Sequence, residues 1–250
     1  MSAYDVAGPA AAPAIVFLHG TRVDRTIWAG QVRTFSDRYR TIAADLPGHG
    51  ELADIPFGLH AFIARLDAII GTEVADGRTA LVGHSLGGYV AIEYASRFPG
   101  RTAALVVCNA CLEPRRLLTI PHRSLAYVAG LAGQRLRERV GDRVRSVAYR
   151  SVTAGAAAPD AGGLVFKGSR NAVRDVVGQQ FLPRLRSYPG PVLLVNGADD
   201  PLFRRDEAAF LAASRDGTLR LVEGAGHVPF IEQPEAFDET LRRFLDSIHW

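Results

Sequence analysis

The sequence is poor in the features of membrane and secreted proteins. Its 250 residues contain no apolar stretch near the roughly 20 residues that a membrane-spanning helix requires. Its start, Met1–Asp5, has neither the basic region nor the apolar region of a secretion signal. We therefore expect a cytoplasmic protein that does not insert into a membrane.

Cysteine is also scarce, with only Cys108 and Cys111 present, in a C-x-x-C spacing. Redox pairs and halves of zinc sites use this spacing, but a zinc site needs two further ligands, and no other cysteine or paired-histidine motif supplies them. Cys108 moreover follows the apolar stretch 103–107, where a small apolar side chain fits. We predict two structural thiols, no metal site and no cofactor.

Charge is small in sum but unevenly distributed. The net charge is +3, yet residues 112–186 hold 14 basic and 5 acidic side chains, against 15 and 21 in the rest of the chain. Two interpretations stay open: solvated helix faces with a bias toward arginine, or a basic roof over a site that favours anionic substrates. No interleaving of aromatic and basic residues appears, so no nucleic-acid partner is expected.

What the sequence does have is an alternation of short apolar segments with amphipathic ones. Strands are predicted at 14–18, 41–44, 79–82, 103–107, 192–195 and 218–222. Helices are predicted at 23–35, 59–70, 86–98 and 234–248. Strands that are apolar throughout and separated by helices indicate an α/β fold, with a parallel sheet covered on both faces.

One region interrupts this alternation. Residues 112–186 are rich in Arg, Ala and Gly, with helical patterns at 124–131 and 134–147 and a predicted loop at 153–163. The chain length suits one large globular domain with an inserted lobe. We therefore predict a core formed by residues 1–111 and 187–250, and an insertion at 112–186.

The most informative motif is Gly83–Gly88, which reads G-H-S-L-G-G directly after the predicted strand 79–82. A G-x-S-x-G motif at a strand-to-helix junction holds its serine on a sharp turn, and the glycines avoid clashes where the backbone doubles back. The serine hydroxyl is then exposed at the end of the sheet. Ser85 is therefore a candidate nucleophile.

A serine nucleophile needs a base and an acid that orients the base. His227 lies in a glycine-rich loop after the predicted strand 218–222, and Asp199 and Asp200 follow the predicted strand 192–195. Loops at the carboxyl ends of parallel strands are where such sheets bind ligands. His227 is the candidate base, while the residues alone do not separate Asp199 from Asp200 as the acid.

The developing oxyanion needs hydrogen-bond donors, for which we predict two backbone amides. These are the amide of Leu86, at the start of the helix after the serine, and that of Thr21, in the loop after His19-Gly20. His19 itself is interpreted as a structural loop residue. His84 is predicted to line or support the pocket, with its ring directed away from Ser85.

Taken together, these motifs resemble the α/β-hydrolase superfamily, in its branch with a helical cap. The resemblance rests on five segments in the family's order: Phe17–Gly20, Asp45–Gly50, Gly83–Gly88, Val192–Asp200 and Gly224–Pro234. It implies a mostly parallel, roughly eight-stranded sheet whose one or two leading antiparallel strands are abbreviated, and it makes residues 112–186 a helical cap. The family spacing G-x-x-D selects Asp200 as the acid.

The resemblance further implies a serine hydrolase that cleaves an ester, thioester or lactone of a small molecule, including anionic ones, through an acyl-enzyme. The same triad also serves C–C bond hydrolases, lyases, acyl transferases and small-molecule receptors of this fold, and these alternatives stay open. Tyr89 stands where the menaquinone-pathway lyases of the superfamily carry arginine, which disfavours that activity. Glu51 replaces a serine common in the family. The oligomeric state is not predicted.

Overall fold

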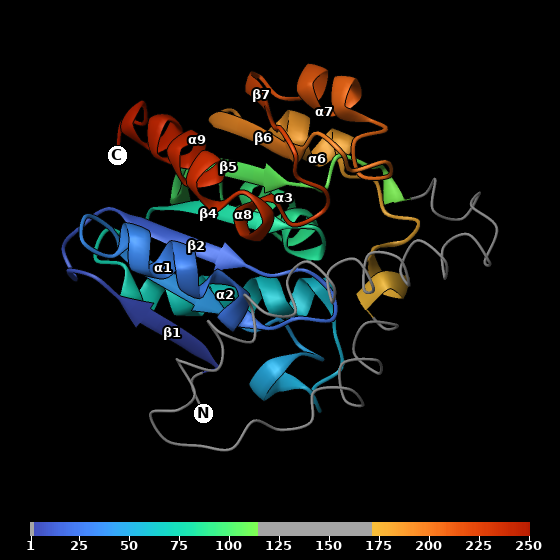
Figure 1. Cartoon of the computed structure of the whole chain (residues 1–250). Helices are drawn as coiled ribbons and strands as arrows, with labels where there is room; N and C mark the ends of the chain where they lie inside the picture. The colour runs from blue at the N-terminus through green and yellow to red at the C-terminus, as the bar shows by residue number, and fades with distance from the viewer. Residues whose placement is uncertain (1–2, 115–171) are drawn as a thin grey trace.

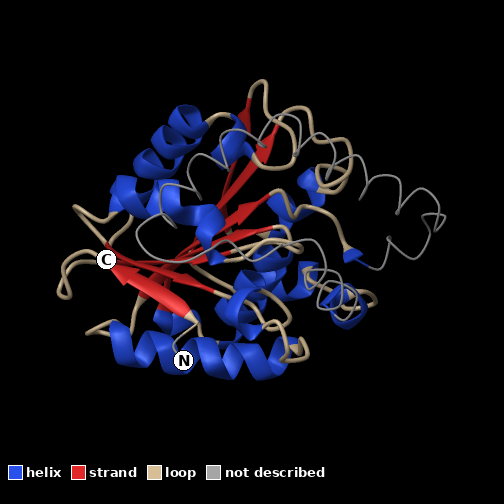
Figure 2. Ribbon diagram, turned by 60° about the horizontal axis from the view of Figure 1, so that its bottom comes forward, coloured by secondary structure: helices blue, strands red, loops and turns tan. Residues whose placement is uncertain are grey.

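The computed structural model describes residues 3–114 and 172–250. Its strands are β1 Tyr4–Ala7, β2 Ala14–Leu18, β3 Arg40–Ala44, β4 Thr79–His84, β5 Thr102–Cys108, β6 Pro191–Gly197 and β7 Asp216–Val222. They form one twisted sheet in the order β1-β3-β2-β4-β5-β6-β7 (Figure 2). β1 runs antiparallel to β3, and every other neighbouring pair is parallel. The predicted mostly parallel sheet is thus confirmed.

The strand count differs from the prediction. The described sheet has seven strands, where roughly eight were predicted. The segment before Ala14 accounts for the difference, because it forms one four-residue antiparallel strand, β1, where the family fold has two leading strands. The six strands predicted from apolar segments are all present, each with bounds within two residues of those observed.

Helices cover both faces of the sheet (Figure 1). They are α1 Ala29–Phe35, α2 Leu59–Glu73, α3 Leu86–Arg97, α6 Leu182–Ser187, α7 Glu207–Ala213, α8 Pro229–Glu232 and α9 Pro234–Asp246, with short 3-10 helices η1 Arg25–Trp28, η2 Gly50–Leu52 and η3 Pro99–Arg101. One buried cluster joins the sheet to α2, α3, α6 and α7, and a second joins it to α1, α8 and α9. Successive strand residues alternate between them, as the pleat requires: Val16 lies in the first and Phe17 in the second.

Several local features differ from the sequence prediction. The helix predicted at 23–35 divides into η1 and α1, and it starts only after Asp24, whose carboxylate accepts the Thr26 amide as an N-cap. The strand β1 and the helices α6, α7 and α8 were not predicted. These elements are short, at four to seven residues, so they contain too few periods of the apolar pattern to stand out.

Most of the predicted insertion lies outside the described residues, including the helical patterns at 124–131 and 134–147 and the loop at 153–163. The helical cap therefore stays a prediction. At its described end, α6 packs with α3 in one buried cluster through Leu185. Across residues 3–114 and 172–250, no helix combines the length and the apolar character that a bilayer crossing demands.

Candidate active site

The predicted nucleophile, acid and base lie at one edge of the sheet. Ser85 follows β4, Asp200 follows β6 and His227 follows β7, and all three strands run in parallel. Ser85 and Asp200 are buried, whereas the His227 side chain is 23% exposed. The base is thus the member of the set that faces solvent.

Ser85 occupies a strained backbone conformation. Its φ is 52° and its ψ is −114°, in a region that residues with a side chain rarely adopt. The turn is fixed on both sides, because the Ser85 amide donates to the Cys108 carbonyl at 2.9 Å and the Gly88 amide donates to the Ser85 carbonyl at 2.9 Å. This is the sharp strand-to-helix turn that the G-x-S-x-G motif predicts.

Two glycines permit the close packing around this turn. A Cβ added to Gly83 would lie 2.2 Å from the Gly87 carbonyl oxygen, and one added to Gly87 would lie 2.2 Å from the Leu18 carbonyl oxygen. Both obstacles are backbone atoms, so neither can move aside as a flexible side chain would. The start of α3 is therefore packed directly against β2 and β4.

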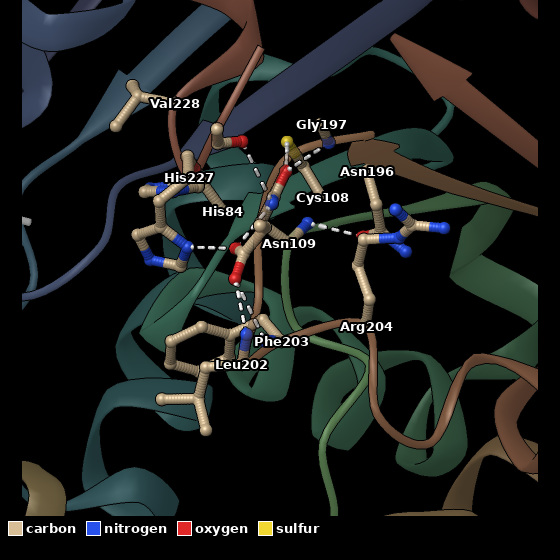
Figure 3. A network of polar contacts seen from close by, with 12 residues as sticks. His84, Cys108, Asn109, Asn196, Gly197, Leu202, Phe203, Arg204, His227 and Val228 are labelled. Atoms are coloured by element: carbon tan, nitrogen blue, oxygen red, sulfur yellow. Dashed lines mark hydrogen bonds and ion pairs between the residues drawn. The ribbon is translucent and has the colours of Figure 1, made fainter. Parts of the chain in front are cut away.

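Asp200 and His227 form a short hydrogen bond, with 2.7 Å between Asp200 Oδ2 and His227 Nδ1 (Figure 3). The other carboxylate oxygen of Asp200 accepts the amides of Leu202 at 2.9 Å and Phe203 at 3.0 Å. The Phe203 ring also packs against the imidazole, with 4.4 Å between ring centroids. The ring of His227 is therefore fixed both by a carboxylate and by an aromatic neighbour.

These contacts favour the ionised form of Asp200. Burial raises the pKa of Asp200, but the hydrogen bond and charge of His227 and the two backbone amides lower it by more, and the net pKa lies below the usual value. The carboxylate is thus ionised at neutral pH and accepts a proton held on His227 Nδ1. The Nε2 lone pair of a neutral His227 is then available to act as a base.

Asp199, the other acid candidate, is not part of this arrangement. Its side chain is exposed, and its amide donates to the Ala225 carbonyl at 2.9 Å. It therefore serves the turn between β6 and the His227 loop. The structure brings Asp200, and not Asp199, to His227, which agrees with the choice made by the family spacing.

The loop that carries His227 is held by Glu232, at the end of α8. The two Glu232 carboxylate oxygens accept the Gly226 amide at 2.8 Å and the Val228 amide at 3.0 Å. The loop also lies directly on β6, since a Cβ added to Gly197 would come 1.9 Å from the Gly226 carbonyl oxygen. The backbone on both sides of His227 is therefore fixed.

His84 supports the same loop. Its Nε2 lies 2.8 Å from the His227 carbonyl oxygen, which can only accept, so Nε2 carries the proton. Burial, with a smaller contribution from His227, lowers the pKa of His84 to about 3. The ring is therefore neutral and acts as a hydrogen-bond donor next to Ser85, in keeping with the supporting role predicted for it.

Asn109 is a member of the site that sequence reasoning missed. It lies just beyond β5, is fully buried, and donates through Nδ2 to Asp200 Oδ2 at 2.7 Å and to the Gly226 carbonyl at 3.2 Å (Figure 3). The one signal in the sequence was its place after a predicted strand, at the edge where Ser85, Asp200 and His227 were also expected.

The loop after β2 lies beside the serine. A Cβ added to Gly20 would be 3.2 Å from Ser85 Cβ and 2.8 Å from His84 Nδ1. His19 is buried, with Nδ1 donating to the Gly20 carbonyl at 2.7 Å and Nε2 accepting the Leu46 amide at 2.9 Å. It is thus a structural histidine. Thr21 and Leu86, whose amides were predicted to bind the oxyanion, follow Gly20 and Ser85 directly.

Glu51, which sequence comparison left unexplained, has a structural partner. Arg25 Nη2 lies 2.5 Å from Glu51 Oε1, and the same guanidinium contacts Asp5 and the buried Asp45. Asp45 in turn accepts the amides of Arg25 and Glu51, each at 2.9 Å. Glu51 therefore completes an ion-pair cluster that ties η2 to the segment after β2.

Neither cysteine is suited to redox or metal chemistry in the described part of the chain. Both thiols are free and buried, and burial raises their pKa, to about 12 for Cys111, so neither forms the thiolate that a reactive cysteine needs. Among residues 3–114 and 172–250, no three His, Cys, Asp or Glu side chains are grouped to hold a metal ion.

The link between nucleophile and base is not among the observed contacts. Within the described ranges, no hydrogen bond joins the Ser85 hydroxyl to the His227 ring. The two residues are connected through His84, whose ring centroid is 4.8 Å from that of His227. Nucleophile–base hydrogen bonds are commonly long before a substrate binds, so the relay from Ser85 to His227 is a proposal, made below.

The family model, the related sequences and the solved structures point to the same family and fold. The model described as "Alpha/beta hydrolase family" matches residues 15–240. The chain is 26% identical to an uncharacterised carboxylesterase of Bacillus subtilis, over 96% of this chain and 81% of that protein. It is 24% identical to a pimeloyl-[acyl-carrier protein] methyl ester esterase of Nitrosospira multiformis, over 93% and 94%. The enol-lactonase structure from Burkholderia xenovorans superposes with a TM-score of 0.76 at 21% identity, covering 98% of this chain and 96% of that one.

Proposed function

The chain belongs to the alpha/beta hydrolase family, and from this premise we propose that it cleaves esters, thioesters or lactones of small molecules through an acyl-enzyme on Ser85. The observation that carries the proposal is the 2.7 Å bond between Asp200 and His227, at the sheet edge where Ser85 stands on its strained turn. The esterases among its relatives support the substrate class.

Each residue has one role in the proposed reaction. Ser85 Oγ attacks the substrate carbonyl while His227 Nε2 takes its proton, and Asp200 stabilises the resulting imidazolium. The amides of Thr21 and Leu86 bind the oxyanion. His227 then returns the proton to the leaving alkoxide or thiolate. Water attacks the acyl-enzyme with His227 again as the base, and the acid leaves while Ser85 recovers its proton.

The substrate preference is proposed from charge. The basic excess within residues 112–186 favours anionic over neutral acyl or alcohol groups if these side chains face the site. One of them is already engaged elsewhere, since Arg184 Nε pairs with the buried Glu93 at 2.8 Å. Matched neutral and anionic esters, compared at low and high salt, test the preference. Equal kcat/KM for the pair at low salt would remove it.

Hydrolysis of p-nitrophenyl acetate and butyrate tests the reaction itself. Ser85→Ala is expected to lower kcat by on the order of 10⁴-fold or more, because the nucleophile acts as a unit with its base. Ser96→Ala is the matched control: Ser96 lies at the far end of α3 and donates only to the Glu93 carbonyl. Equal rates in the wild type and Ser85→Ala would overturn the assignment. Turnover of β-diketones without ester cleavage would point to C–C bond hydrolysis.

A further inference from the structure

Asp200 is surrounded by four hydrogen-bond donors that come from three segments of the chain. The amides of Leu202 and Phe203, in its own turn, hold Oδ1. His227 Nδ1 and Asn109 Nδ2 share Oδ2, each at 2.7 Å. Local turn contacts thus fix one carboxylate oxygen, and the oxygen that faces the base depends on Asn109, 91 residues earlier in the sequence.

The orientation of the Asn109 amide follows from its backbone partners. The Gly197 amide, which can only donate, lies 3.2 Å from Oδ1, and the Gly226 carbonyl, which can only accept, lies 3.2 Å from Nδ2. A flipped amide would place Nδ2 against the Gly197 donor, and Oδ1 against two acceptors, Asp200 Oδ2 and the Gly226 carbonyl. Nδ2 therefore faces Asp200, and its second proton is used on the loop that carries His227.

The backbone of Asn109 is shaped for this contact. Its φ is +45°, in the left-handed region, where asparagine is tolerated better than most residues with a side chain. Its amide donates to Asn196 Oδ1 at 2.9 Å, at the end of the neighbouring strand β6. Backbone strain at a buried residue is typical of functional sites, and Asn109 combines such strain with a contact to the candidate acid Asp200.

We propose that Asn109 is a positioning residue for the acid–base pair: its amide holds Asp200 Oδ2 in line with His227 Nδ1 and ties both to the base loop through the Gly226 carbonyl. The inference rests on the proposed function of Asp200 and His227. Asn109 acts through Asp200 and does not touch the reacting atoms. Its loss therefore misaligns the base during proton transfer while leaving the binding of the ester unchanged.

Kinetics of the purified full chain with p-nitrophenyl acetate test this role. Asn109→Gly removes the amide and suits the positive φ, and Asn109→Ala is the second variant. We expect each to lower kcat by about 10- to 100-fold with KM nearly unchanged, because small misplacements of a catalytic group have effects of this size. The control is Tyr188→Phe, which removes a buried hydrogen bond to the Thr102 carbonyl at the opposite end of β5 and should keep the wild-type kcat.

A double-mutant cycle separates positioning from general structural support. If Asn109 acts through Asp200, Asn109→Gly should change kcat no further once Asp200→Ala is present. Multiplying effects in the double variant would overturn the proposal. A wild-type kcat in Asn109→Gly would also overturn it, and so would a loss of kcat in Tyr188→Phe as large as that in Asn109→Gly.

Nitrogen-15 NMR of the His227 ring gives a readout that does not need turnover. In the wild type we expect the proton to reside on Nδ1, and in Asn109→Gly a mixture of the two neutral tautomers. An unchanged Nδ1 tautomer in Asn109→Gly would contradict the positioning role. If the wild type cleaves no ester at all, the proposed function fails, and the tautomer shift alone then decides the inference about Asn109.

Discussion

The nucleophile side and the acid–base side of the candidate site are built in different ways. Around Ser85, position is set by backbone against backbone: Gly83 and Gly87 allow β2, β4 and α3 to approach so closely that no Cβ fits between them. The His227 loop also meets β6 closely at Gly197, but the side chains of Asp200 and His227 and the loop between them are held in addition by hydrogen bonds with the side chains of Asn109, His84 and Glu232. Close backbone packing alone thus places Ser85, whereas the placement of Asp200 and His227 depends in addition on long-range side-chain hydrogen bonds.

The difference determines how each side fails when it is changed. A side chain added at a close backbone contact must displace a whole strand or helix, so its effect reaches stability and activity together. A donor removed from a hydrogen-bond network leaves the fold in place and shifts the charge or direction of one group.

The acid–base side should show the largest loss of activity with the smallest loss of structure. Asp200→Asn keeps the shape of the side chain but presents an amide that cannot accept from Nδ1 in the same way, so His227 takes the wrong tautomer. We expect kcat to fall by on the order of 10⁴-fold. Asp199→Asn, one residue earlier and exposed, should retain the wild-type kcat. A similar loss in both variants would contradict the assignment of Asp200.

The nucleophile side should lose activity and stability at once. In Gly87→Ala the new Cβ meets the Leu18 carbonyl oxygen at 2.2 Å. We expect kcat to fall by about 10²-fold and the free energy of unfolding to fall by about 1–3 kcal/mol. The matched control is Gly100→Ala in η3, where an added Cβ meets no atom within 4 Å. Ester hydrolysis and urea denaturation measure the two effects.

How far each side could be predicted from the sequence follows from the same contrast. Gly83, Ser85 and Gly87 lie within five residues of one another, so the strained turn was visible as a motif. Six of the seven described strands were visible because each contains a run of mainly apolar residues. The role of Asn109 was not visible, because its side chain contacts Gly197, Asp200 and Gly226, which are 88 to 117 residues away. No local pattern records which donors the fold will bring to a buried carboxylate.

Glu51 and the pair Asp199 and Asp200 show the same limit of local sequence patterns. Glu51 is conspicuous in the sequence as a departure from the family pattern, yet its reason, the ion pair with Arg25, appears only when η2 folds back onto the segment after β2. The choice between Asp199 and Asp200 likewise needed either the family spacing or the structure, since both residues follow the same strand. Long-range polar contacts are therefore the part of this site that sequence patterns record least.

We expect the stability of the fold to decrease at acid pH because of His84, which lies between Ser85 and the His227 loop. Its pKa in the folded protein is about 3, against an ordinary value of 6.5, because burial disfavours the charged ring. Above pH 6.5 the ring is neutral in both states and its contribution to stability is complete. As the pH falls from 6.5 toward 3, the unfolded chain binds a proton that the folded protein does not, and the free energy of unfolding drops by about 1.4 kcal/mol per pH unit.

Urea denaturation at several pH values between 7 and 4 measures this slope. In His84→Gln the slope should be smaller by about 1.4 kcal/mol per pH unit, because glutamine does not titrate. His19 is also buried, and burial lowers its pKa as well, so part of the slope remains in the variant. Parallel slopes for wild type and variant would show that His84 takes up its proton without opening the site.

The smallest effect has the opposite sign and tests whether close contact, rather than glycine itself, defines the nucleophile side. Gly30 lies in α1, on the other face of the sheet, and an added Cβ there meets no atom within 4 Å. Alanine at this helical position restricts the unfolded chain without a clash, so Gly30→Ala should raise the free energy of unfolding by about 0.5 kcal/mol and leave kcat unchanged. Replacement of glycine by alanine would then stabilise α1 at Gly30 and disrupt α3 at Gly87. The difference between the two positions is the Leu18 carbonyl oxygen, which faces Gly87. A loss of stability in Gly30→Ala as large as that in Gly87→Ala would remove this distinction.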